Sequence, residues 1–217
     1  MAGLPPTAPL LLGIGTPACC QPILPIMNTS RWVLSVWVWV WVALAASSCK
    51  KEDPEASLPP ATQEGKNTAG CLIDGKPFVA ESYGGGILSA PIPALDGGFS
   101  FINSYRLSIS GKLNGEAVEV MLFFQGRQTG TYLLNQNTRY YPQGDPKVIL
   151  NHATFRYVGS GIYEEWGTDA QHTGQVVLTK ADVPNGLSAG TFAFTAVSSQ
   201  NPGKTVVITQ GRFDRKY

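Results

Sequence analysis

The stretch YRLSISGKLNGEAVEVMLFFQ, residues 105–125, decides the fold class of this protein. Apolar and polar residues alternate over residues 105–110, and successive side chains of a β-strand point to opposite faces of a sheet. The dipeptide Asn114-Gly115 separates this run from a second one, which is the strongest short signal for a two-residue hairpin turn. The stretch therefore predicts two antiparallel strands joined by a tight turn.

The second of these strands, Glu116–Gln125, has two unequal faces. One face is wholly apolar and carries Val118, Val120, Leu122 and Phe124. The other face begins polar, with Glu119, and ends apolar, with Met121 and Phe123. We predict that this strand is central in its sheet or covered at its C-terminal end.

Further short strands of the same kind are expected along the chain. They are predicted at residues 130–134, 148–150, 154–158, 161–166, 174–179, 191–196 and 205–209. The last two flank Asn201-Pro202-Gly203, a turn signal in which Pro presets φ and Gly tolerates positive φ, so they should form an antiparallel hairpin. No stretch of about ten residues shows the 3.6-residue apolar period of a helix.

These patterns predict a single all-β domain. An antiparallel β-sandwich is favoured because alternating strands and nearly all-apolar strands both occur. The alternative is an up-and-down β-barrel, in which most strands alternate cleanly all the way round.

The first 48 residues differ in composition from the rest. Arg31 precedes an apolar run at residues 32–46 that holds four of the five tryptophans, and small residues follow it. This is the layout of a secretory signal peptide, and the run is shorter than the ~20 residues that span a bilayer as a helix. Residues 1–26 lack any positive charge, so we expect translation to begin at Met27 and residues 1–26 to be a gene-start error or a disordered extension.

The residues Ala45-Ala46-Ser47-Ser48-Cys49 resemble a bacterial lipobox, the signal whose cysteine becomes the lipidated N-terminus of the mature protein. The resemblance implies a lipoprotein signal peptide at residues 27–48, lipid on Cys49 and attachment to the outer membrane. An ordinary secretory signal with an incidental Cys49 is the alternative.

The charged residues 50–55 resemble the tract that follows the lipidated cysteine in surface-exposed lipoproteins of Bacteroidetes-type bacteria. This resemblance implies display at the cell surface. Residues 49–70 are then expected to be the lipidated cysteine and a polar tether, and residues 71–217 to be the β domain.

The end of the chain resembles an uncharacterised lipoprotein family of the same bacteria. Its members end in the strand pair SGTFxFxA…VxITxGxFD, preceded by a strand GxVxxTKxD. Residues 187–196 and 206–214 resemble the pair, with Ala189 inserted between the serine and the glycine, and residues 174–182 resemble the preceding strand. The activity of this family is unknown, so the resemblance implies no functional residue.

Composition excludes several functions. With 16 basic and 15 acidic residues the net charge is +1, which gives no sign of a nucleic-acid partner. His152 and His172 have no His, Cys or Asp partner at ligand spacing, so we predict no metal site and no cofactor. Cys71 is expected to pack as a small hydrophobe, without a disulfide.

Aromatic side chains in the middle of the chain are the candidate ligand contacts, because Tyr and Trp offer large amphipathic contact areas. These candidates are Tyr140, Tyr141, Tyr163 and Trp166. Glu164 and Glu165 are adjacent, and adjacent residues of a regular strand face opposite sides, so they should not share one site.

We therefore predict no catalytic residue, and a lipid-anchored module that binds a glycan, an envelope protein or a small apolar ligand. One alternative is a purely structural envelope protein. The other is a glycan-processing hydrolase whose carboxylates converge in three dimensions, with Glu164, Glu165, Asp169 and Asp145 as candidates.

Overall fold

The computed structural model describes residues 53–87, 89–100, 103–136, 150–159 and 164–217. Within these ranges the regular elements are strands and one 3-10 helix, η1 (Pro54–Ser57), and no α-helix occurs. The strands are β1 (Thr68–Ile73), β2 (Lys76–Val79), β3 (Leu95–Phe99), β4 (Ser104–Leu113), β5 (Glu116–Gln125), β6 (Gly130–Leu134), β7 (His152–Tyr157), β8 (Glu165–Gly167), β9 (Gly174–Asp182), β10 (Leu187–Ser198) and β11 (Thr205–Lys216). The predicted all-β, antiparallel class is confirmed.

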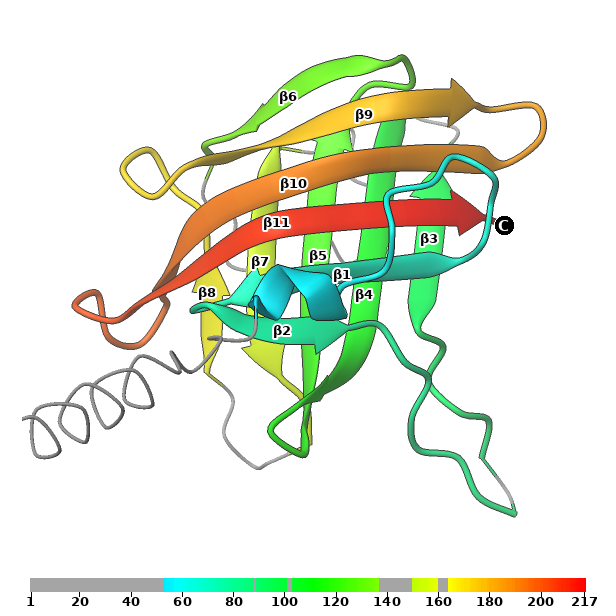
Figure 1. The fold of residues 1–217 in the computed structure, drawn as a ribbon. Coiled ribbons are helices and arrows are strands. Elements are labelled where there is room, and N and C mark those ends of the chain that lie inside the picture. The colour runs from blue at the N-terminus through cyan, green and yellow to red at the C-terminus, as the bar shows by residue number, and fades with distance from the viewer. Residues whose placement is uncertain (1–52, 88, 101–102, 137–149, 160–163) are drawn as a thin grey trace, which may run out of the picture. The chain divides into compact units, whose positions relative to one another are not determined.

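The strands form one curled antiparallel sheet that folds over its own core (Figure 1). Strands β6, β9, β10, β11, β1 and β2 make one layer, and β3, β4, β5, β7 and β8 cross behind it. At one corner β10 passes from β9 to β8, where Val197 pairs with Gly167 and Ser198 with Trp166. An isolated bridge also joins the two layers, from Ala80, just after β2, to Gly111 of β4.

The architecture thus combines features of the favoured sandwich and of the barrel alternative. Two packed layers enclose the core, as in a sandwich, and the hydrogen bonding continues round a corner, as in a barrel. The hydrogen bonding continues from one layer to the other because β10 is long enough to pair with β9 along most of its length and with β8 at its end.

The hairpin of β4 and β5 is the one that the sequence predicts. Asn114 and Gly115 both have positive φ, 54° and 87°, as a two-residue turn of this kind requires. The apolar face of β5 lies in the core, and Met121 and Phe123 on its other face are buried as well. The prediction of a central or covered strand is therefore confirmed, since β5 pairs with β4 on one side and β7 on the other.

The remaining strands differ in how far the sequence predicts them. β6 has the predicted bounds, and the β10–β11 hairpin is present with its turn closed by a 2.9 Å hydrogen bond from the Lys204 amide to the Asn201 carbonyl. For the strand expected at 148–150, only Leu150 lies within the described residues, and it is not in a strand. β3, which contains Gly97 and Gly98, was not predicted because glycine carries no strand signal.

The domain begins earlier than the expected boundary at residue 71. Strand β1 starts at Thr68, and Leu58 is buried. The segment between them is bound by Asp214 of β11, whose carboxylate accepts hydrogen bonds from the Thr62 hydroxyl at 2.6 Å and the Gly65 amide at 2.7 Å. Most of the expected tether that the structure describes is therefore part of the folded domain.

Cys71 lies in the core with no exposed surface and is a free cysteine. Burial raises the pKa of its thiol to about 12, because the apolar surroundings disfavour the thiolate. The expectation that it packs as a small hydrophobe is confirmed.

Candidate functional site

Strand β11 contains a bulge that interrupts its pairing with both neighbouring strands. Against β10 the register moves from Phe192–Gly211 to Phe194–Ile208, and the ladder against β1 shifts at the same place. Each ladder therefore accommodates one extra residue on β11 near Gln210. Bulges of this kind occur often beside functional sites, where they redirect a side chain.

Gln210 adopts a backbone conformation that its residue type disfavours. Its φ is +53°, whereas the other described non-glycine residues with positive φ are all Asn or Asp, which tolerate this region. A left-handed conformation costs an ordinary residue roughly 1–2 kcal/mol. Strain that persists in a folded protein is often found at a binding site, so the outlier directs attention to the surface around Gln210.

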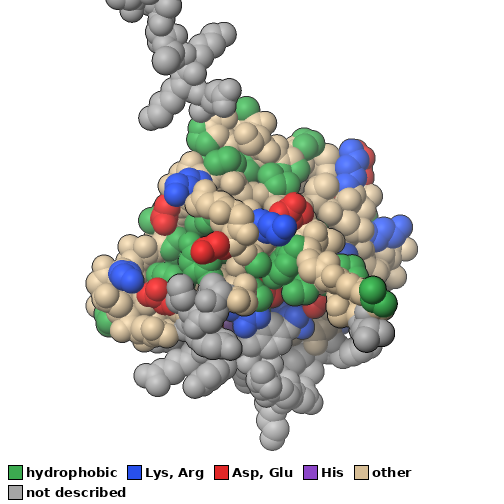
Figure 2. Space-filling model, turned by 90° about the horizontal axis from the view of Figure 1, so that it is seen from below, with side chains coloured by type: hydrophobic (Ala, Val, Ile, Leu, Met, Phe, Trp, Pro, Cys, Tyr) green, Lys and Arg blue, Asp and Glu red, His purple; other side chains and the backbone are tan. Residues whose placement is uncertain are grey.

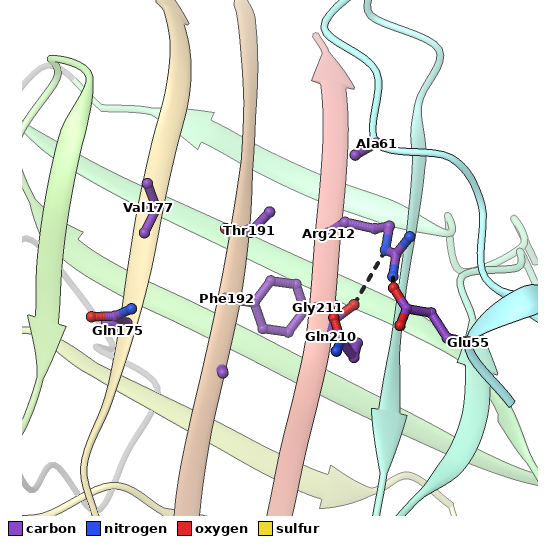
Figure 3. A pocket seen from close by; sticks show the side chains of 10 residues that line it. Glu55, Ala61, Gln175, Val177, Thr191, Phe192, Gln210, Gly211 and Arg212 are labelled. Atoms are coloured by element: carbon purple, nitrogen blue, oxygen red, sulfur yellow. Dashed lines mark hydrogen bonds and ion pairs between the residues drawn. The ribbon is translucent and has the colours of Figure 1, made fainter. Parts of the chain in front are cut away.

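A groove of about 380 Å³ lies at this bulge, on the outer face of β9, β10 and β11 (Figure 3). Its far wall is the N-terminal segment, which contributes Glu55 and Ala61. The volume falls within the roughly 300–1,000 Å³ of small-molecule sites. The lining is a mixture of polar and apolar groups, from Glu55, Ala61, Gln175, Val177, Thr191, Phe192, Ala193, Gln210, Gly211 and Arg212.

The charged groups of the groove neutralise each other. A guanidinium nitrogen of Arg212 lies 2.6 Å from a carboxylate oxygen of Glu55, and Nε of Arg212 donates a 3.3 Å hydrogen bond to the Gln210 carbonyl (Figure 3). The guanidinium is thus fixed in position and already paired. The groove offers hydrogen-bond donors and acceptors without a net charge that would select an anion.

Three exposed side chains supply the remaining polar groups of the groove. They are the amides of Gln175 and Gln210 and the hydroxyl of Thr191, from three adjacent strands. Between them Val177 and Ala193 are only partly buried and provide apolar contact. Such a surface can hydrogen-bond a neutral, hydroxyl-rich ligand while covering its apolar faces.

Of the predicted aromatic contacts, only Trp166 lies within the described residues; Tyr140, Tyr141 and Tyr163 lie outside them. The Trp166 side chain is in the core, 8% exposed, with its ring centroid 5.4 Å from that of Phe155 and 5.9 Å from that of Tyr157. It borders a hollow of about 120 Å³ at the lower end of the domain. Its main role in the structure is therefore packing.

The surface at this lower end is mixed in character. Figure 2 shows apolar side chains interspersed with acidic and basic ones over this face. The hollow beside Trp166 has the same mixture, with Asp74 and Lys76 next to Leu113 and Val206. It is well below the usual volume of a ligand site, so the groove at Gln210 is the better candidate.

Glu164 and Glu165 both border a separate hollow of about 170 Å³, so the prediction that they do not share one site is wrong. The reason is that β8 begins only at Glu165, and the alternation of a regular strand does not extend to Glu164. The two carboxylates nevertheless have different partners. Glu164 accepts a 2.7 Å hydrogen bond from the Ser198 hydroxyl, whereas Glu165 is paired across the ladder with Arg156. Burial raises the pKa of Glu165, against the opposing effect of the Arg156 charge, and the nearby Glu119 carboxylate raises it further.

The other two candidate carboxylates do not join this pair. Asp169 accepts hydrogen bonds from the backbone amides of Gln171 and His172 and lies 3.0 Å from the His172 ring, in a turn of its own. Asp145 lies outside the described residues. Within the parts of the chain that the structure covers, no three His, Cys, Asp or Glu side chains lie together as a metal ion would require.

The structure is an antiparallel β-domain with a groove on the outer face of β9, β10 and β11. The chain belongs to a family described as a domain of unknown function (DUF6252), which matches residues 99–215. The match extends from the last residue of β3 almost to the end of β11 and includes the bulge. No curated protein and no solved structure matches the chain.

The groove residues were not predicted from the sequence. Gln175, Gln210 and Arg212 are scattered polar residues within strand patterns and have no motif of their own. The usable signal was the interruption of alternation at Thr209-Gln210-Gly211, where two polar residues and a glycine follow a regular run. Such an interruption inside a strand marks a bulge.

Proposed function

We propose that this protein is a lipid-anchored envelope protein whose groove at the β11 bulge binds a neutral saccharide. The anchor rests on the lipobox resemblance at Cys49 and on the wider resemblance to lipoproteins of Bacteroidetes-type bacteria. The observation that carries the binding site is the strained Gln210 in the wall of the groove of about 380 Å³.

The chemistry of the groove favours a saccharide over charged ligands. Arg212 is already paired with Glu55, so a phosphate or carboxylate ligand would have to displace an existing ion pair. Amide and hydroxyl side chains, by contrast, both donate to and accept from the hydroxyl groups of a sugar. An envelope protein is the other partner class, and it would cover more surface than the groove alone.

Binding is tested with the purified protein on an array of neutral glycans, followed by calorimetric titration of any hit. We expect Gln175→Ala and Gln210→Gly each to weaken binding by about tenfold, because each removes a ligand hydrogen bond. Gln128→Ala, at an exposed glutamine outside the groove, is the matched control and should bind normally. Unchanged affinity in both groove variants would exclude this site.

The anchor is tested separately by growing cells with labelled palmitate. The wild-type protein should carry the label and the Cys49→Ala variant should not. A wild-type protein without label would mean that Cys49 is not lipidated and that residues 27–48 are an ordinary secretory signal.

A hydrolase acting at Glu164 and Glu165 is the second candidate, favoured by the raised pKa of Glu165 beside another carboxylate. A carboxyl that stays protonated could act as the acid and its neighbour as the base or nucleophile. A panel of chromogenic glycosides tests this activity. Turnover that is lost in both Glu164→Gln and Glu165→Gln would favour the enzyme over the binding module.

A further inference from the structure

A hairpin formed by residues 82–87 and 89–94, here called the arm, projects from the domain after β2 (Figure 1). It is closed by two pairs of backbone hydrogen bonds, between Tyr83 and Ile92 and between Gly86 and Ser89. At its end Ile87 is 102% exposed, more than any other large apolar residue that the structure describes. With this exposure the Ile87 side chain has no packing role within the domain.

The arm has the properties that entry into a lipid bilayer requires. Residues 82–95 include no charged side chain, so insertion would not bury an unpaired charge. The amides of Gly86 and Ser89 donate to each other's carbonyls, which leaves these backbone groups satisfied away from water. A protein partner, by contrast, needs an interface of about 1,000 Å² or more, which the exposed Ile87 side chain by itself does not supply.

Only a short length of chain separates the proposed anchor from the part of the domain that carries the arm. Helix η1 packs against β2, the strand from which the arm departs. Asp53, which caps η1, is four residues from Cys49, and four residues span at most about 14 Å. A lipid on Cys49 would therefore hold the edge of the domain that carries the arm close to the membrane surface.

We propose that the arm is a second membrane contact, in which Ile87 inserts into the apolar boundary of the lipid layer that holds the anchor. This inference rests on the lipid anchor of the proposed function and is independent of the saccharide groove. Interfacial segments of this kind bury their apolar face roughly 5–10 Å deep. The arm would fix the orientation of the domain, which one flexible attachment point does not.

The test uses the full protein isolated from cells and reconstituted in vesicles of phosphatidylethanolamine and phosphatidylglycerol. Ile87→Cys is labelled with the environment-sensitive fluorophore NBD, and phospholipids with a spin label on the acyl chain are the quencher. Leu133→Cys is the matched control, because Leu133 is also an exposed apolar residue, 59%, but lies on β6. The buried Cys71 should not react with the label.

We expect quenching by the spin-labelled lipid to be about threefold stronger at position 87 than at position 133 if Ile87 reaches the acyl boundary. Equal quenching at the two positions would overturn the proposal. So would a blue-shifted emission at position 87 that lipid spin labels leave unquenched, because it would mean that a protein surface covers the arm.

Failure of the anchor gives a different result. Mass spectrometry would then find Cys49 without lipid, and the labelled protein would be added to preformed vesicles from solution. Quenching at position 87 in that experiment supports the arm on its own, and its absence rejects the arm together with the anchor.

Discussion

The hydroxyl of Thr62 donates a 2.6 Å hydrogen bond to the carboxylate of Asp214, which lies 152 residues later in the chain. The same carboxylate accepts hydrogen bonds from the backbone amides of Glu64, Gly65 and Lys66 at 2.7–3.2 Å. Asp214 is 1% exposed. One buried side chain of β11 thus holds the segment that leads from the N-terminal region into β1.

The first prediction concerns the contribution of Asp214 to stability. Asp214→Asn turns an amide NH₂ toward backbone donors that need an acceptor, and we expect a loss of about 2–4 kcal/mol in the free energy of unfolding. Urea denaturation measures this change in the free energy of unfolding. Asp182→Asn, whose side chain bonds only Asn185 in an exposed turn, is the control and should lose much less.

The second prediction concerns the pH dependence of this contact. Burial alone would raise the pKa of Asp214, but the hydrogen bonds from Thr62, Glu64, Gly65 and Lys66 outweigh burial and lower it. A lowered folded-state pKa means that the stabilisation is complete above the unfolded pKa of about 3.9 and is lost as pH falls toward the folded value. As the pH falls from neutral to below the folded-state pKa, the free energy of unfolding should therefore decrease less in Asp214→Asn than in the wild type.

The third prediction separates strain from binding at Gln210. Gln210→Gly removes the cost of a positive φ, and we expect it to stabilise the domain by about 1 kcal/mol while it weakens ligand binding. Thermal unfolding and glycan titration measure the two effects on one variant. A Gln210→Gly protein that is less stable than the wild type would contradict the prediction, because it would mean that contacts of the Gln210 side chain outweigh the cost of the positive φ.

The fourth prediction concerns the glycine that follows the strained residue. A Cβ on Gly211 would lie 2.5 Å from the ring of Phe192, and overpacking of this kind costs typically about 1–3 kcal/mol. Gly211→Ala should therefore unfold at lower urea concentration. Gly203→Ala, where the nearest atom is Asn201 Oδ1 at 3.4 Å, should stay within about 0.5 kcal/mol of the wild type.

The fifth prediction follows from the burial of Cys71. Its thiol has no exposed surface and a pKa raised to about 12, so iodoacetamide should leave it unmodified in the folded protein at neutral pH. Mass spectrometry should find the modification only after denaturant is added. Rapid modification of the native protein would mean that β1 opens readily.

The sequence predicts strands best where side-chain alternation is regular. The β4–β5 and β10–β11 hairpins follow from alternation and turn residues, because both signals are local. Strand β3 escaped prediction because Gly97 and Gly98 carry no side chain that could alternate; Gly98 instead provides room for the ring of Tyr217. The burial of Trp166 also depends on tertiary packing, since an aromatic residue suits a core and a binding surface equally.

The amino-acid sequence by itself determined the all-β class, the tight turns and the apolar faces of the central strands, because each depends on residues only a few positions apart. Only the tertiary structure decided how β10 joins two layers, how Asp214 holds the segment around Thr62, and how the β11 bulge and Glu55 form one groove. These features unite residues from distant parts of the chain. Their positions follow from strand pairing and core packing over the whole domain, which local sequence patterns do not encode.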